Sequence, residues 1–480
     1  MKKLLLSFFL TTSISIFADA FHNINGFFGE RASGMGGAFT AVSDDPSGAF
    51  YNPAGLSYAY DNAISLSASN YTTIKKTYKN VIGPGQNYSR NSQNYIPNFF
   101  GIVREMGKGK IAFSIVSPVQ DSFQRNDTIN NPIFYNDVRS LRFYNRENYN
   151  QIMTGFSYSR PITKKISLGA TLYYFNDQAS ISNTSLVLNR DKSYSTQTLS
   201  DNRVTVGFMP IIGLMFTPTE KLSFGLSLRR TMVTGENRLV NTFALNSSAA
   251  DSDQIVFVEG THRALSGNIG NTLYKGAAPT GRIPEVNEVR AGVAFFPNKK
   301  LMTSFDIINT SGYSRKQDNT EILFGGGVNP TITLTDKENL ELKRYETTNF
   351  AAGLEYFLTE YIAIRVGGFT NYANSKKIDW LTSALQARNR SISDTEVIST
   401  QGNTTIQYRI PALRDNPRNE YVNNFGFSLG LSFSTSKASI AINYIRETGL
   451  GASQVDNTRP SQQLQYNSES FYVVVSSRNN

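Results

Sequence analysis

Several residue types that support catalysis or metal binding are scarce in this chain. Its 480 residues include no cysteine, two histidines and one tryptophan. Without cysteine the chain forms no disulfide, no thiolate metal site and no thiol nucleophile. Two histidines leave little material for His-based catalysis or a metal centre, so we expect no enzyme activity, no metal and no cofactor. No compact basic patch interleaved with aromatic residues occurs, which argues against a nucleic-acid partner.

The sequence also lacks an apolar run long enough to be a transmembrane helix. Residues 1–20 are organised like a secretory signal peptide, with two lysines, an apolar core ending at Phe17 and the cleavage sequence Ala18-Asp19-Ala20. A membrane anchor is the alternative, but the apolar run is shorter than the ~20 residues that span a bilayer. The mature chain is therefore expected to be either a soluble exported protein or a transmembrane β-barrel.

Tyrosine (25), phenylalanine (32) and glycine (36) are abundant, while charged residues reach only 18%. From Asn62 onward, apolar residues alternate with small or polar ones. In the segment 222–229, leucine and phenylalanine alternate with serine, glycine and arginine, which places each set on one face of a strand. A soluble β-sandwich shows the same alternation, so periodicity alone leaves both classes open.

The lengths of the strands and connections favour the barrel. We predict fourteen strands between residues 62 and 477, most of them near the 9–11 residues of a tilted membrane strand. Short connections such as 161–163 and 297–299 alternate with long ones such as 120–148 and 373–422. Short periplasmic turns and long extracellular loops are typical of outer-membrane barrels. We thus predict an all-β, 14-stranded transmembrane antiparallel barrel in the cell outer membrane.

The barrel interpretation carries expectations about the surroundings of the protein. Its apolar face would contact outer-membrane lipid, the barrel-assembly machinery would insert it, and we expect a monomer. Aromatic residues near strand ends would form interfacial girdles. Ordinary strand propensity is the alternative explanation for them. These aromatic residues include Tyr158, Tyr173, Tyr174, Phe175, Phe295 and Tyr361.

The segment 21–61 precedes the first strand and does not alternate. Its glycines are not followed by the Lys-Ser/Thr pair of a phosphate-binding loop. The sequence Asp44-Asp45-Pro46 is more typical of a turn than of an acid–base pair. Small side chains let a backbone pack closely against a surrounding wall. The composition therefore suits a compact plug inside a barrel.

This segment resembles a known family in three short motifs. The run from Ser33 to Ala41, the pair Asp44-Asp45, and Asn52-Pro53-Ala54 before Gly55-Leu56 are similar to the N-terminal hatch of the FadL/TodX family of outer-membrane transporters for hydrophobic compounds. The rest of the chain resembles the family only in topology. The resemblance implies a signal peptide at 1–20, an N-terminal hatch at 21–61 and a 14-stranded barrel at 62–480.

The resemblance also implies a mechanism and candidate site residues. Extracellular loops would capture a hydrophobic molecule, most plausibly a long-chain fatty acid. The molecule would pass to a pocket in the barrel and leave sideways through the wall once the hatch shifts, in passive transport. Asn52, Pro53 and Ala54 would form the hatch turn, and Phe27 and Phe28 match ligand-contacting positions more loosely. The remaining hatch residues in this set are Gly34, Gly36 and Gly37.

Further site candidates follow from the residues themselves. The expected strand 109–119 carries Pro118, and because proline donates no ladder hydrogen bond this residue is a candidate for the gap in the wall. A plain strand end is the alternative. Apolar loop residues predict either an extracellular capture groove or a small core that packs the loops together. These loop residues are Trp380, Leu381, Leu385 and Phe257.

Two other functions remain open at this stage. A general porin would have the same strands around an open, water-filled lumen, and a surface adhesin would use its long loops to bind a partner. The sequence does not name the ligand, because apolar pockets discriminate poorly among hydrocarbons.

Overall fold

The computed structural model describes residues 22–95, 97–133, 138–191, 194–247, 271–275, 283–317, 320–326, 329–336, 340–375, 396–401, 404–409, 420–453 and 462–479. No helix in these ranges is long and apolar enough to cross a membrane. The signal-peptide region 1–20 and the capture-groove candidates Phe257, Trp380, Leu381 and Leu385 lie outside the described residues.

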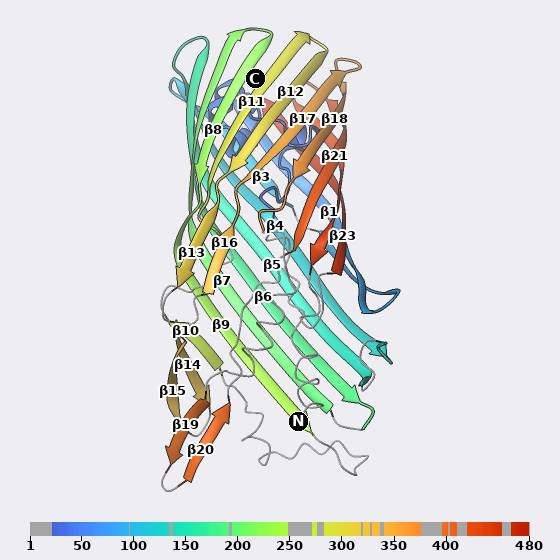
Figure 1. Cartoon of the computed structure of the whole chain (residues 1–480). Coiled ribbons are helices and arrows are strands. Elements are labelled where there is room, and N and C mark those ends of the chain that lie inside the picture. Colours follow the sequence, from blue (N-terminus) through green and yellow to red (C-terminus); the bar gives the residue numbers. More distant parts are fainter. Residues whose placement is uncertain are drawn as a thin grey trace.

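Fourteen antiparallel strands form a closed barrel, which confirms the predicted fold class (Figure 1). Wall neighbours pair from β1 round to β23, and β23 returns to pair with β1 along Asn62–Tyr78. The wall strands are β1 (Asn62–Gly83), β3 (Phe99–Met106), β4 (Gly109–Asn130), β5 (Val138–Pro161), β6 (Ile166–Asn189), β7 (Tyr194–Thr219), β8 (Leu222–Arg230), β11 (Asn287–Asn298), β12 (Leu301–Thr310), β17 (Thr347–Phe357), β18 (Ile362–Asn371), β21 (Tyr421–Ser434), β22 (Ala438–Ser453) and β23 (Gln462–Asn479).

Residues that alternate between apolar and small or polar types in the sequence alternate between the outer and inner faces of the wall. Phe224 and Leu228 are 42% and 46% exposed on the outside, whereas Ser223 and Ser227 between them are 3% and 1% exposed. The same pattern recurs along β21 and β17. Lipid cannot hydrogen-bond to backbone groups, so a sheet crosses a bilayer only as a closed barrel with an apolar outside. The outer face of this wall meets that requirement.

The girdle expectation is wrong for two of its aromatic residues. Tyr174 is exposed on the outer face, but Tyr173 and Phe175 are 0% and 1% exposed and belong to the core inside the barrel. Side chains alternate across a strand, so consecutive residues of β6 cannot all face the membrane.

The connections at the two barrel ends differ in length, as predicted. The long ones, however, are largely strands and not loops. Much of the predicted loop 120–148, and of the segments 75–95 and 177–204, is strand, because hairpins of the wall continue far past the apolar belt. In these extensions apolar side chains such as Phe123, Tyr149 and Ile181 are buried, so the pattern of the belt, with its apolar residues on the outside, does not mark them in the sequence. The additional strands are β2 (Gln86–Tyr95), β9 (Met232–Ser247), β10 (Asn271–Lys275), β13 (Tyr313–Gln317), β14 (Thr320–Gly326), β15 (Asn329–Asp336), β16 (Leu340–Arg344), β19 (Glu396–Gln401) and β20 (Thr404–Arg409).

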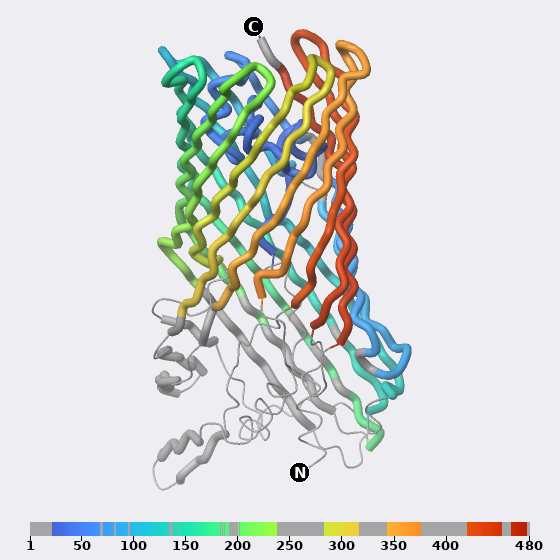
Figure 2. Tube along the Cα trace, turned by 45° about the horizontal axis from the view of Figure 1, so that its top comes forward, coloured from blue at the N-terminus to red at the C-terminus, as the bar shows by residue number. Residues whose placement is uncertain are grey.

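Residues 22–59, which we call the lumenal segment, lie inside the barrel near the end with the short turns (Figure 2). The segment contains α2 (Glu30–Gly34), α3 (Gly48–Tyr51) and the 3-10 helix η1 (Pro53–Tyr58). Most of its side chains are buried, and its apolar residues share a core with the inward face of the wall. β1 begins three residues after the segment, at Asn62.

Candidate ligand path through the barrel

Glycines of the wall allow the lumenal segment to approach closely. A Cβ at Gly169 would overlap the backbone of Pro53 and Ala54, and one at Gly225 would overlap Thr40. A Cβ at Gly367 would overlap the backbone of Met35 and Gly36. Several neighbouring wall strands therefore have glycine at the positions where the lumenal segment contacts them. The glycines of this belt are Gly169, Gly213, Gly225, Gly292, Gly353, Gly367 and Gly430.

The Asn52-Pro53-Ala54 turn is fastened to this belt by neutral hydrogen bonds. The Asn52 side chain accepts from the Ala54 amide at 3.2 Å and donates to the carbonyls of Thr40 at 2.8 Å and Leu214 at 3.1 Å. The Ala54 carbonyl accepts from the hydroxyls of Ser159 at 3.0 Å and Ser167 at 2.9 Å. One asparagine thus caps η1 and ties it to β7, and the following carbonyl ties it to β5 and β6.

The glycine-rich part of the segment packs against the opposite side of the wall. The Gly34 carbonyl accepts from Ser428 at 2.8 Å. Gly37 has a φ of +83°, which disfavours other residues, and a Cβ there would overlap the ring of Phe27. Gly36, with a φ of +63°, lies against the backbone of Gly367 and Gly368.

Buried ion pairs add a second fastening at α2. Arg31 pairs with Asp44 and, at 2.6 Å, with Glu355 of β17. Arg365 of β18 bridges Glu355 at 2.7 Å and Glu30 at 3.1 Å. Removing one member of such a buried network leaves an unpaired charge and is strongly destabilising.

One carboxyl of the lumenal segment titrates near neutral pH. Burial raises the pKa of Asp45 to about 6, although its hydrogen bonds from the Ser47 amide (2.7 Å) and hydroxyl (2.5 Å) oppose the rise. A raised pKa means that folding favours the protonated form. The contribution of this turn to stability is therefore greatest at acid pH and falls as the pH rises through about 6.

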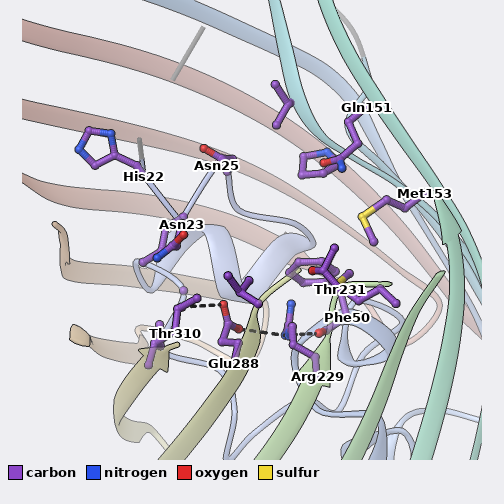
Figure 3. A pocket seen from close by; sticks show the side chains of 18 of the residues that line it. His22, Asn23, Asn25, Phe50, Gln151, Met153, Arg229, Thr231, Glu288 and Thr310 are labelled. Carbon is purple, nitrogen blue, oxygen red and sulfur yellow. Dashed lines mark hydrogen bonds and ion pairs between the residues drawn. The ribbon is translucent and has the colours of Figure 1, made fainter. Parts of the chain in front are cut away.

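The first of two cavities, chamber one, lies between the lumenal segment and the wall strands β4–β8, β11 and β12, and Figure 3 shows its lining. Phe28 and Phe50 of the lumenal segment form an edge-to-face pair at 4.8 Å on one side of it. Apolar side chains from the barrel complete most of the rest. They include Met153, Phe175, Met209, Ile283, Val286 and Ile308.

A small charged cluster lies on one side of chamber one. Arg229 lies 3.2 Å from Glu288 and donates to the Phe50 carbonyl at 2.7 Å (Figure 3). Arg290 pairs with the same Glu288 at 2.5 Å. The Arg229 guanidinium also lies 4.4 Å from the centre of the Phe50 ring, a cation–π contact. Two arginines share one carboxylate, so these three side chains leave one positive charge toward an apolar chamber.

Chamber two lies on the other side of residues 24–27, which line both cavities. Phe27 separates the two, with its ring 4.8 Å from that of Phe369 in an edge-to-face contact. The Phe27 carbonyl accepts from Asn98 at 3.0 Å. The remaining lining comes from β1, β2, β4, β18, β22 and β23 and from the connection before β3. Phe27 and Phe28, proposed ligand contacts, thus both line chamber one, and only Phe27 lines chamber two.

The wall ladder is interrupted where the two chambers meet. β4 pairs with β3 up to Phe99↔Val116, and beyond that point it lies against β2, with no ladder between β2 and β4 in the described residues. Asn94 bridges them instead, donating to the Gln120 carbonyl at 2.8 Å and accepting from the Ser122 amide at 2.9 Å. On the other edge of β4, the register with β5 shifts between Val116 and Val119.

Pro118 lies at this interruption and lines both chambers. It is interior to β4, so the alternative of a plain strand end is wrong. The pairing of β4 with β5 continues through a bulge at this point, whereas the ladder with β3 ends at Val116, so Pro118 remains a candidate for a gap on the β2 side of β4.

The charged cluster of chamber one was not among the sequence candidates. Arg229 falls on the inward set of the alternating segment 222–229, where its neighbours on that face are glycine and serine. An inward-facing arginine among small residues is the feature of the sequence that could have identified this cluster. Its partners Glu288 and Arg290 come from a distant strand, and only the pairing of β8 with β11 brings them together.

Comparison with known proteins supports the fold. No family profile and no curated protein sequence matches the chain. A FadL homologue from Pseudomonas aeruginosa superposes with a TM-score of 0.57 at 13% identity, over 95% of this chain and 99% of that one. The toluene transporter TodX from P. putida gives 0.59 at 14% identity, covering 95% and 100%. The toluene transporter TbuX from Ralstonia pickettii gives 0.57 at 13% identity, with the same coverage.

This chain has the FadL-type barrel fold. At these identities the similarity concerns the arrangement of the strands and not the ligand.

Proposed function

We propose that this protein is a passive outer-membrane channel for hydrophobic compounds, closed by a hatch formed by the lumenal segment. The observation that carries the proposal is an apolar chamber inside a closed barrel that extends to an interruption of the wall at Pro118. An apolar molecule is poorly accommodated in a water-filled pore. A side exit keeps it in apolar surroundings until it reaches the bilayer. The fold shared with a FadL homologue and toluene transporters supports the same conclusion.

Within this class, a long-chain fatty acid is the ligand that chamber one favours. Its hydrocarbon tail matches the apolar lining, and its carboxylate matches the two arginines of the Arg229–Glu288–Arg290 cluster, on which Asp306 is a further, buried counter-charge. A neutral hydrocarbon offers these arginines no anionic group. The cluster also holds the Phe50 carbonyl of the hatch, so a carboxylate that binds Arg229 competes for a hatch contact.

The hatch moves, in this proposal, at the Asn52-Pro53-Ala54 turn. The turn is held by neutral hydrogen bonds, each contributing roughly 0.5–1.5 kcal/mol. The ion pairs of Arg31 and Arg365 anchor α2 more firmly and act as the fixed end. Ligand would enter from the extracellular loops, where Trp380, Leu381, Leu385 and Phe257 remain predicted capture residues, and leave between β2 and β4.

The alternatives account for less of the structure. A general porin has an open lumen, whereas residues 22–59 occupy this one. A surface adhesin needs neither an internal apolar chamber nor a broken wall. No described cluster of three His, Asp or Glu side chains could hold a metal ion, and the shared fold is that of transporters.

A disulfide between hatch and wall tests the proposal. The hydroxyls of Ser57 and Ser159 lie 2.5 Å apart, and the chain has no cysteine to interfere, so S57C/S159C can link η1 to β5. We expect the oxidised variant to take up labelled palmitate at least tenfold more slowly than the wild type, and reduction to restore the rate.

A wall-to-wall disulfide is the matched control. S65C/S476C joins β1 to β23, whose hydroxyls lie 3.1 Å apart, without touching the turn. Its oxidation should leave uptake unchanged. Normal uptake by oxidised S57C/S159C would refute movement of the turn as a step in transport.

A further inference from the structure

Chamber two differs from chamber one in its chemistry. Its lining carries a larger share of hydroxyl, amide and carboxylate groups than that of chamber one, although it lies at the wall interruption through which an apolar ligand would leave. The polar residues come from β1, β2, β4, β22 and β23 and the connection before β3. They include Thr72, Asn94, Asn98, Ser117, Gln120, Asp121, Glu447, Ser468 and Ser470.

Most of these polar groups are engaged with one another. Thr72 and Ser470 hydroxyls lie 2.9 Å apart, and Gln120 donates to Ser117 at 2.7 Å. Glu447 accepts from the side-chain amides of Asn371 at 3.0 Å and Asn424 at 2.9 Å. The chamber is therefore a built polar surface held by internal hydrogen bonds.

Two buried oxygens of the lining lack a hydrogen-bond partner among the described residues. They are Oδ1 of Asn98 and Oδ1 of Asp121, whose residues are 4% and 3% exposed. The other atoms of these groups are used, because Asn98 donates to the Phe27 carbonyl and Asp121 accepts from Arg90 at 2.8 Å. A buried acceptor without a donor costs free energy comparable to a lost hydrogen bond. Both oxygens therefore lack a donor among the described residues, and both belong to residues that line chamber two.

The charge of the lining restricts which donor fits. Asp121, which is paired with Arg90, and Glu447 both line chamber two, and none of its described lining residues is an arginine or a lysine. A carboxylate ligand would be repelled here, in contrast to chamber one. A neutral hydroxyl donates to the orphaned oxygens and accepts from the amides and serines around it.

We propose that chamber two binds the hydroxylated, uncharged head group of an amphiphile, such as an acylated or alkylated polyol. This inference rests on the proposed channel function and adds a second ligand class to it. The chain of such a molecule remains in chamber one or passes toward the wall interruption, while its hydroxyls bind beside Asn98 and Asp121. The channel then discriminates among apolar ligands by their head groups in two separate places.

Paired lipids that differ in hydroxyl groups test this site. We would titrate 1-monodecanoylglycerol and methyl decanoate into the full-length protein in nanodiscs and compare dissociation constants by calorimetry. Two additional hydrogen bonds predict about tenfold tighter binding of the monoacylglycerol. Asn98→Leu, which keeps the side-chain size, should remove most of that preference. Gln151→Leu, the same amide-to-leucine change in chamber one, should retain it.

The outcomes separate this site from the proposed channel function. Equal affinity of the wild type for the two lipids, or an unchanged preference in Asn98→Leu, would overturn the head-group site while ester binding still supported the channel. Tighter binding of decylamine than of the glycerol ester would overturn it in favour of a cation site. Failure of both lipids to bind would contradict both proposals. If Asn98→Leu does not assemble, as judged by its heat-dependent gel mobility, Ser470→Ala supplies the second test and should weaken the preference several-fold.

Discussion

The barrel wall meets the lumenal segment differently on its two sides. On the side of β6–β8 and β17–β21, glycines bring wall and segment backbones into contact, and the ladders run continuously through the contact region. On the side of β1, β2 and β4, chamber two separates the segment from much of the wall, and Asn94 replaces the missing ladder. Backbone contact with glycine leaves no room for a ligand, whereas an interrupted ladder can open without breaking regular pairing. The first side is thus suited to sealing and the second to passage.

The largest expected effect comes from adding one methyl group on the sealed side. In Gly367→Ala the new Cβ overlaps the backbone of Met35 and Gly36, so the lumenal segment has to move away from β18. We expect the barrel to assemble but to leak, with ion conductance in planar bilayers rising at least tenfold.

Gly368→Ala is the control for that variant. It changes the next residue of β18, where a Cβ would come no closer than 3.9 Å to the Gly426 carbonyl. Its conductance should remain that of the wild type. A Gly367→Ala channel that stays closed would show that close backbone contact is not what seals the lumen.

An intermediate effect is expected from the charged cluster of chamber one. Arg290→Met removes the surplus positive charge and leaves the Arg229–Glu288 pair intact. Affinity for palmitate should fall about tenfold, because one charge-assisted hydrogen bond is worth roughly 1.5–3 kcal/mol, while affinity for methyl palmitate should change little.

Arg230→Met is the control for the loss of an arginine charge. Arg230 is exposed on the opposite face of β8, outside chamber one. It should leave the affinity for both lipids unchanged. Equal losses for palmitate and its ester in Arg290→Met would mean that Arg290 packs against the chain and does not recognise the carboxylate.

The smallest effect is expected at the interrupted side of the wall. Asn94→Ala removes the two hydrogen bonds that the Asn94 side chain makes to β4, and it leaves the Arg90–Asp121 and Arg125–Ser89 contacts between β2 and β4 in place. The Ser122 amide should then exchange its hydrogen several-fold faster, as measured by mass spectrometry. Gln93→Ala, on the exposed face of β2, should leave that rate unchanged. An unaltered exchange rate of the Ser122 amide in Asn94→Ala would mean that other contacts hold β2 against β4.

Sequence reasoning was most successful where one physical rule governs many residues. Alternation with period two, together with connection length, was sufficient for the closed 14-stranded barrel and for its apolar outside. The prediction failed at Tyr173 and Phe175, which were assigned to the girdle because they lie next to other aromatic residues. Alternation with Tyr174 would have placed both inside the barrel. The alternation rule did not identify the strand extensions, because their apolar residues, such as Phe123 and Tyr149, are buried and do not form the apolar outer face of the belt.

The candidate site was predictable only in part. Asn52, Gly34 and Pro118 stood out because their chemistry is local: a cap, a backbone without a side chain, and a residue without an amide hydrogen. Where they lie relative to the chambers depended on residues far away in the chain. The Arg229 cluster and the lining of chamber two draw on separate strands and have no local motif.

The sequence by itself determined an exported, cysteine-free chain whose apolar residues alternate so that only a closed sheet can bury its backbone groups in lipid. The tertiary structure decided what the lumen contains. It placed two arginines beside one carboxylate in an apolar chamber, and it grouped hydroxyls and amides from five strands at the break in the wall. The reason is that strand pairing fixes which inward residues become neighbours, and that register is a property of the closed barrel.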